Sequence, residues 1–144
     1  MKPETWGKGK LASDPCCIVT CFDGKDVATA LDYYKKSLFK NGDLKFDCRL
    51  AVACGRHSDM FWEEGAFVID VTGMNSVTVN MPTKDTVTFG AGCVAGNVLN
   101  AIKQFNIDSL EADSKFIYTI ASGNAYTVGV SGICLTGGAG CLLR

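Results

Sequence analysis

Residues 48–58 read CRLAVACGRHS, an apolar run that ends in a turn carrying the only histidine of this 144-residue chain. The small and β-branched side chains predict a buried strand over 48–54, because short apolar runs bounded by turn residues are typical of sheet interiors. His57 would then follow the carboxyl end of that strand, where open α/β sheets bind ligands. The run alone leaves two interpretations open: a ligand-binding histidine and a solvent-facing turn residue.

The segments before this run complete a βαβ pattern. CCIVTCF at 16–22 predicts a strand, and DVATALDYYKKSLFKNG at 26–42 spaces its apolar residues as a helix does, with Asn41 and Gly42 as the stop signal. Together with the strand at 48–54, they predict a helix packed on a mainly parallel sheet.

The segments after this run predict a different arrangement. Three short alternating or apolar runs, at 66–71, 76–80 and 86–92, are separated by turn residues and predict a β-meander. VAGNVLNAIKQF at 94–105 carries one apolar face and predicts a helix. The closing residues 122–144 show no periodicity and predict loops. The whole pattern indicates one α+β unit.

Composition places the chain among ordinary globular proteins and argues against several partners. It is 47% hydrophobic and 20% charged, and 14 basic residues against 15 acidic ones give a net charge of -1, which does not fit a nucleic-acid surface. The polar N-terminal arm over 1–13 contains no apolar core of a signal peptide, and no later run approaches the roughly 18 apolar residues of a membrane span. We expect no membrane partner, no signal peptide, and a location that is cytoplasmic or unknown.

The eight cysteines are interpreted as mainly reduced, buried small hydrophobes, because nothing indicates a secreted disulfide framework. A metal site at CCIVTC is disfavoured, since no C-x-x-C pair is present and the histidine is distant in sequence. We therefore predict no metal ligands.

Two glycine-rich stretches each allow two interpretations. GAGCVAG at 90–96 follows a strand and opens a helix as a phosphate loop does, but its spacing is not G-x-G-x-x-G, which favours helix–sheet packing. The closing run, with Gly129, Gly132, Gly137, Gly138 and Gly140, either leaves backbone N–H groups open to an anionic pyrophosphate or forms a set of tight turns.

Taken in order, four motifs carry a family resemblance: CRLAVACGRHS, AFVIDVTGMNSVTVN, TVTFGAGCVAGNVLNAI and YTVGVSGICLTGGAGCLLR. They follow a succession of Gly-Gly-His-Ser, V-I-D-L-S-x-M-N-x-V, V-x-G-A-G and T-V-G-V-x-G-x-x-L-x-G-G-x-G. Over residues 14–144 the chain resembles the FAD-binding PCMH-type domain of the vanillyl-alcohol oxidase superfamily, and most its berberine-bridge-enzyme-like branch.

The resemblance implies a small βαβ subdomain followed by a mostly antiparallel sheet subdomain with helices, and FAD as cofactor. It implies a flavoprotein oxidoreductase that oxidises an alcohol, sugar or amine with oxygen as acceptor. The alternatives are a truncated or degenerate flavin-binding module without catalysis, and an α/β phosphate-binding protein unrelated to flavin. Because the chain ends at Arg144, we expect the family's substrate domain and catalytic base to be absent, which leaves enzyme activity open and assigns no catalytic residue.

By the same resemblance, two loops would hold the FAD pyrophosphate. The implied cofactor-binding residues are Ala53, Cys54, Gly55, Arg56, His57, Ser58, Thr127, Val128, Gly129, Gly132, Thr136, Gly137, Gly138 and Gly140. His57 matches the histidine that commonly bonds covalently to the flavin 8α-methyl carbon.

Two positions bear on how the flavin would be held. Bicovalent relatives add a cysteine where this chain has Ala125, so we expect a single histidyl linkage at most. Arg56 replaces the second glycine of Gly-Gly-His, so its side chain must either point away or contribute its charge to the pyrophosphate. If that position requires a positive φ, arginine is costly there.

Overall fold

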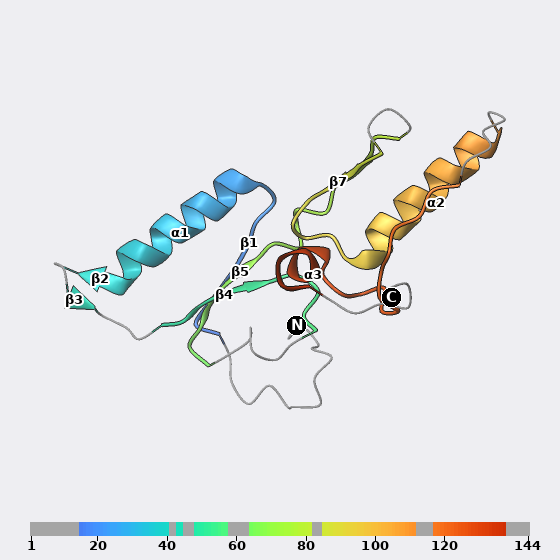
Figure 1. The fold of residues 1–144 in the computed structure, drawn as a ribbon. Coiled ribbons are helices and arrows are strands. Elements are labelled where there is room, and N and C mark those ends of the chain that lie inside the picture. The colour runs from blue at the N-terminus through green and yellow to red at the C-terminus, as the bar shows by residue number, and fades with distance from the viewer. Residues whose placement is uncertain are drawn as a thin grey trace. The chain divides into compact units, whose positions relative to one another are not determined.

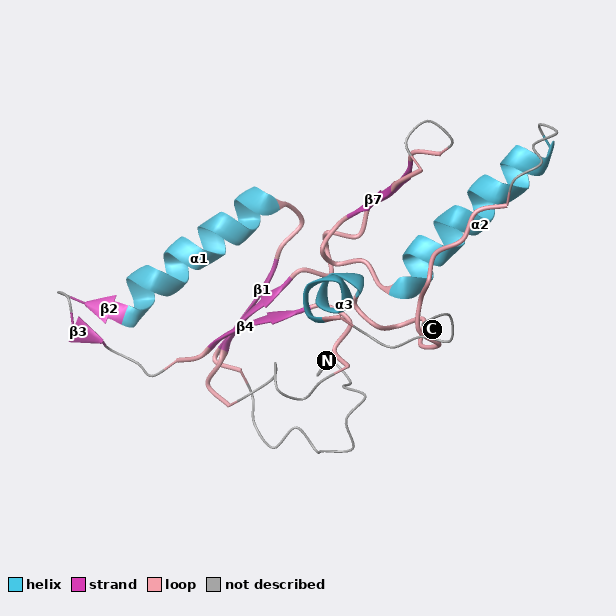
Figure 2. Cartoon of the chain, viewed as in Figure 1, coloured by secondary structure: helices cyan, strands magenta, loops and turns pink. Residues whose placement is uncertain are grey.

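A computed structural model describes residues 15–40, 43–44, 48–57, 64–81, 85–111 and 117–137. The chain divides into two compact units, residues 1–74 and 75–144, each with its own helices and strands (Figure 2). The first contains a parallel sheet and the second an antiparallel pair of strands, which is the division that the resemblance implies. The arm expected over 1–13 lies outside the described residues.

The sheet of the first unit consists of β1 (Cys17–Thr20), β4 (Leu50–Ala53) and β5 (Phe67–Asp70), in the order β1-β5-β4. Both neighbours run parallel to β5, and in Figure 1 the three strands lie side by side. All four residues of β5 are buried, as expected of a central parallel strand. The carboxyl ends of the three strands therefore meet at one edge.

This order corrects one prediction. The strand at 66–71 was expected to open a meander, but β5 instead pairs in parallel between β1 and β4. The predicted mainly parallel sheet is confirmed. The run FVID is apolar at nearly every position, and such a run does not reveal whether its neighbours are parallel or antiparallel.

Helix α1 (Gly24–Leu38) packs on β5 through aromatic rings. The ring centroids of Tyr33 and Tyr34 lie 6.1 and 5.3 Å from that of Phe67. The helix was predicted over 26–42, but it ends earlier and is followed by a short antiparallel pair, β2 (Phe39–Lys40) and β3 (Asp43–Leu44). The predicted stop signal, Asn41 and Gly42, lies outside the described residues.

The second unit pairs β6 (Val77–Val79) with β7 (Val87–Phe89), antiparallel as predicted. Helix α2 (Ala95–Glu111) begins where the sequence predicts and continues past residue 105. Its apolar face supplies Val98 and Ile102 to a core that also contains Cys93 and the strand valines. The predicted amphipathic helix over a small sheet is confirmed.

The last described element is helix α3 (Val130–Thr136), which the sequence did not predict. It is one short helix of 7 residues with a glycine on either side, and none of its residues is buried. With so short a span and a glycine inside it, the apolar periodicity that reveals a helix does not develop. None of the helices in the described ranges is both long and apolar enough to cross a lipid bilayer.

Candidate functional site

The turn after β4 contains the first group of predicted site residues. Ala53 ends the strand, is buried, and accepts a 2.9 Å hydrogen bond from the N–H of Val71. Cys54, Gly55, Arg56 and His57 follow, all half-buried. The turn therefore leaves the sheet at the carboxyl edge of β4, which is where the sequence places it.

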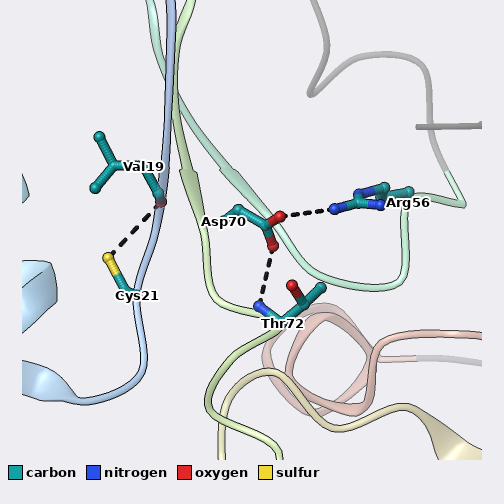
Figure 3. Close-up of polar contacts among 5 residues, drawn as sticks. All are labelled: Val19, Cys21, Arg56, Asp70 and Thr72. Carbon is teal, nitrogen blue, oxygen red and sulfur yellow. Dashed lines mark hydrogen bonds and ion pairs between the residues drawn. The ribbon is translucent and has the colours of Figure 1, made fainter. Parts of the chain in front are cut away.

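Arg56 has a φ of +54°, in the left-handed region that costs a non-glycine residue about 1 kcal/mol or more. The position therefore has the positive φ at which arginine was expected to be costly. The guanidinium turns back toward the sheet, where an Nη donates a 2.6 Å hydrogen bond to the Asp70 carboxylate (Figure 3). The Arg56 side chain was expected either to point away or to contribute its charge to a pyrophosphate. In the structure its charge is directed at the Asp70 carboxylate.

Asp70 is the functional residue that sequence reasoning missed. It ends β5, the residue is only 4% exposed, and its second carboxylate oxygen accepts a 3.0 Å hydrogen bond from the N–H of Thr72 (Figure 3). One buried carboxylate thus joins the turn after β4 to the turn after β5. The sequence did contain a signal for this pairing. Asp70 ends a strand whose other residues are apolar, and a buried carboxylate requires a partner.

The turn after β5 packs tightly against the segment that follows β1. A Cβ added at Gly73 would lie 2.6 Å from the carbonyl oxygen of Cys21 and 2.7 Å from the Phe22 ring. Only glycine fits such an approach to a backbone oxygen. This contact fixes the spacing of two of the three turns at the carboxyl edge.

Acidic side chains gather near the end of β1. Burial, and then the negative charges of Asp26, Asp70 and Asp23, raise the pKa of the Cys21 thiol. Asp23 caps α1 by accepting hydrogen bonds from the N–H groups of Lys25 (2.7 Å) and Asp26 (2.9 Å). These amides of α1 are therefore bound by the protein itself.

The second predicted loop lies in the second unit and is held by the start of α2. The N–H groups of Ala95 and Gly96 donate to the carbonyls of Val128 (2.9 Å) and Tyr126 (2.8 Å). Val94 forms an antiparallel bridge with Gly129. The backbone of 126–129 is thus bound to the first turn of α2.

This pairing decides between the two interpretations of GAGCVAG. The Val94 N–H donates to the Asn97 side chain (2.9 Å), so the amides of residues 94–96 all have acceptors within the protein. A Cβ on Gly96 would approach the Tyr126 carbonyl oxygen to 3.2 Å. The glycine serves close packing, as the sequence favoured, and these amides are not offered to a phosphate.

Helix α3 directly follows residues 126–129, the segment that is hydrogen-bonded to the start of α2. The Val130 N–H donates to the Cys93 carbonyl (2.9 Å), and the Ser131 hydroxyl donates to the Ala91 carbonyl (2.8 Å). The Thr136 hydroxyl donates to the Gly132 carbonyl (2.7 Å), and Gly137 ends the helix with a φ of +83°. The helix is thus anchored at its beginning on the segment before α2.

Gly132 differs from the other glycines described above. No atom lies within 4 Å of the position that its Cβ would occupy, and its φ is not positive. Neither internal packing nor backbone conformation in the described part of the chain requires a glycine there. The missing side chain leaves the backbone of α3 exposed at this point.

The predicted cofactor-binding residues thus form two groups, one in each unit. Ala53 to His57 lie in the first unit, and Thr127, Val128, Gly129, Gly132, Thr136 and Gly137 lie in the second. Ser58, Gly138 and Gly140 lie outside the described residues.

The cysteine prediction is correct for Cys21 and Cys93, which are buried, and wrong for Cys16 and Cys134, which are exposed. The described cysteines all carry reduced thiols. Throughout the described ranges, no three His, Cys, Asp or Glu side chains are grouped as metal ligands would be.

Solved structures share this arrangement of elements. A crystal structure of 6-hydroxy-D-nicotine oxidase from Arthrobacter nicotinovorans matches 82% of the chain with a TM-score of 0.63 at 19% identity. Aclacinomycin oxidoreductase matches 85% with a TM-score of 0.62 at 21% identity. A variant of BBE-like 1 from Physcomitrella patens matches 84% with a TM-score of 0.60 at 24% identity. The chain has the FAD-binding PCMH-type fold.

The shared fold confirms the expected fold class, and it confirms the stated resemblance as a likeness of fold. No protein-family model and no curated protein sequence matches the chain. The chain spans about a fifth of the length of the solved structures, with 22% of the first two and 23% of the third covered.

Proposed function

We propose that this chain binds FAD and forms the flavin-binding part of an oxidoreductase. The observation that carries the proposal is the turn at 53–57, in which Arg56 holds a left-handed conformation against Asp70 and His57 follows directly. The shared fold supports the proposal, and two of the structural neighbours are an oxidase and an oxidoreductase.

In this proposal backbone N–H groups of the turn at 53–57 contact the FAD pyrophosphate, and the second predicted group of residues, within 127–137, is the other candidate contact. Because the Arg56 charge is matched by Asp70, the diphosphate depends on these amides more than on arginine. The space beside Gly132 supports this arrangement, since a backbone without a side chain can approach a ligand closely.

His57 is the proposed point of covalent attachment, through an imidazole nitrogen acting as the nucleophile. Ala125 offers no thiol for a second bond, so one linkage is expected. FAD, when bound, would supply the redox chemistry, which is proposed as hydride removal from an alcohol, sugar or amine donor with oxygen as the electron acceptor. The chain's own part is to bind and orient the cofactor, and the donor and acceptor are proposals about the whole protein.

Absorbance spectroscopy tests the proposal. The purified chain, titrated with FAD and freed of excess by gel filtration, should retain a flavin spectrum, and covalently bound flavin should stay with the protein after acid precipitation. Intact mass should increase by one FAD less two hydrogens, because the bond replaces one hydrogen of the imidazole and one of the 8α-methyl group. A chain that stays colourless after titration would overturn the proposal.

His57→Ala separates binding from attachment. This variant should bind FAD but lose all of it to the acid supernatant, whereas Lys103→Ala, on the exposed face of α2, should behave as the parent does. If the parent protein itself loses its flavin in acid, covalent attachment is wrong and only non-covalent binding remains.

A further inference from the structure

Two cysteines outside the predicted site lie against each other in the first unit. The sulfur of Cys16 is 3.4 Å from that of Cys48, although the two residues are 32 positions apart in sequence. We infer that Cys16 and Cys48 form an oxidisable dithiol, a modification site that hydrogen peroxide converts to a disulfide.

The fold brings these cysteines to the amino-terminal end of β5. The Cys16 N–H donates to the Ala66 carbonyl (3.0 Å), and the Cys48 thiol donates to the Gly65 carbonyl (3.0 Å). The Tyr34 hydroxyl, on α1, donates to the Cys48 carbonyl (2.6 Å). These hydrogen bonds therefore hold Cys16 and Cys48 beside two consecutive residues, Gly65 and Ala66.

The local geometry allows the bond to form. A disulfide requires a sulfur separation of about 2.05 Å, so the two sulfurs must approach by roughly 1.4 Å from the 3.4 Å described. Cys16 is exposed, which gives a small oxidant access to the site.

The reaction has two steps. In the first, one of the two sulfurs attacks the peroxide as its thiolate, which breaks the O–O bond, forms a sulfenic acid and releases hydroxide, which takes up a proton as water. Desolvation, and then the side-chain hydrogen bond with Cys48, raise the pKa of Cys16 to about 11.

The sulfur of the other cysteine then attacks the sulfenic sulfur. The S–S bond forms, the S–O bond breaks, and the proton of the attacking thiol leaves with the departing oxygen as a second water. The two thiols together lose two electrons and two protons, and the peroxide is reduced to two molecules of water.

Peptide mapping tests the pair in the full chain. The reduced protein is treated with hydrogen peroxide, and the remaining thiols are blocked with N-ethylmaleimide before trypsin digestion. Cleavage after Lys10, Lys25, Lys45 and Arg49 yields LASDPCCIVTCFDGK and FDCR, and Cys48 is the only cysteine of the second peptide. The expected product is these two peptides joined, at the sum of their masses less two hydrogens plus two N-ethylmaleimide groups, one each on Cys17 and Cys21.

The adjacent cysteine provides a matched control. Cys17 lies in β1, paired with Phe67, and is half-buried. Cys17→Ser should form the linked peptides as the parent does, whereas Cys16→Ser should reduce them at least about tenfold. The same treatment in urea should remove the preference for this pair, because the fold no longer holds the two sulfurs together.

Two results would overturn the inference. One is a linked product that requires Cys17 and not Cys16. The other is native protein that yields no more of the Cys16–Cys48 link than protein in urea does. Thermal unfolding gives an independent readout, because a crosslink across these positions should raise the Tm by roughly 5 °C or more, and reduction with dithiothreitol should reverse the rise.

Discussion

The Arg56 guanidinium donates a 2.6 Å hydrogen bond to the Asp70 carboxylate, and this ion pair links the turn after β4 to the end of β5. The Asp70 side chain is 6% exposed and the Arg56 side chain 27% exposed, so the carboxylate depends on its partner more than the guanidinium does. This asymmetry leads to different expectations for the two partners.

Replacing Asp70 with asparagine removes the negative charge but keeps an oxygen for the Thr72 N–H. We expect the free energy of unfolding to fall by about 2 kcal/mol, since water can still reach the partly exposed guanidinium. Urea unfolding followed by circular dichroism measures it. Asp32→Asn, on the exposed side of α1, is the control and should change stability little. Equal stability of the two variants would contradict the role given to Asp70.

Arg56→Gly tests the backbone and the charge together. Glycine relieves a left-handed φ by about 1 kcal/mol, but it leaves the Asp70 carboxylate buried without its cation, at about 3 kcal/mol. The substitution alone should therefore destabilise the protein.

In an Asp70→Asn background, the effect of Arg56→Gly should become neutral or stabilising, because the buried charge is gone. The double-mutant cycle, measured by urea unfolding, should give a coupling free energy of about 1 to 3 kcal/mol. Additive effects would show that the two side chains do not stabilise each other.

Gly73→Ala tests the packing of the carboxyl-edge turns. The added Cβ would lie 2.6 Å from the Cys21 carbonyl oxygen, so the backbone must move, and we expect a loss of about 2 kcal/mol. The matched substitution Gly24→Ala, at the first position of α1, meets no atom within 4 Å and should leave the Tm unchanged or raise it. Thermal scans of both variants check the difference.

Asn106 fastens an extended segment to α2 in the second unit. Its side-chain amide donates to the Tyr118 carbonyl (2.7 Å), and its oxygen accepts from the Tyr118 N–H (2.9 Å). Asn106→Ala should lower the free energy of unfolding by about 2 kcal/mol, because two partly buried backbone groups lose their partners. Asn100→Ala, on the exposed face of the same helix, is the matched control and should cost much less.

Alkaline pH should destabilise the reduced protein in part through Cys16. Its pKa is raised from 9.0 to about 11 in the folded chain, so between those values the unfolded chain has released a proton that the folded chain keeps. The stabilisation is complete below pH 9 and is lost as the pH rises toward 11. Unfolding measured under reducing conditions should show a shallower decline in Cys16→Ser than in the parent protein.

The sequence predicted the type of nearly every long element, because strands and helices here carry clear apolar patterns. Strand pairing was harder to predict, since FVID at 67–70 would also suit an antiparallel sheet. The position of the His57 turn followed from the strand that precedes it. Its companion Asp70 was missed because the pairing of Arg56 with it depends on β4 and β5 being neighbours, a fact of topology.

The segment at 126–129 is already ordered before any ligand arrives. Its carbonyls accept from the first amides of α2, and Gly129 is bridged to Val94. Ordering a flexible loop costs about 1 to 2 kcal/mol of conformational entropy per residue. A ligand that binds this backbone would not have to offset that cost. Affinity at this segment should therefore be governed by the contacts themselves, and weakening the start of α2 should lower it without touching a single ligand-binding atom.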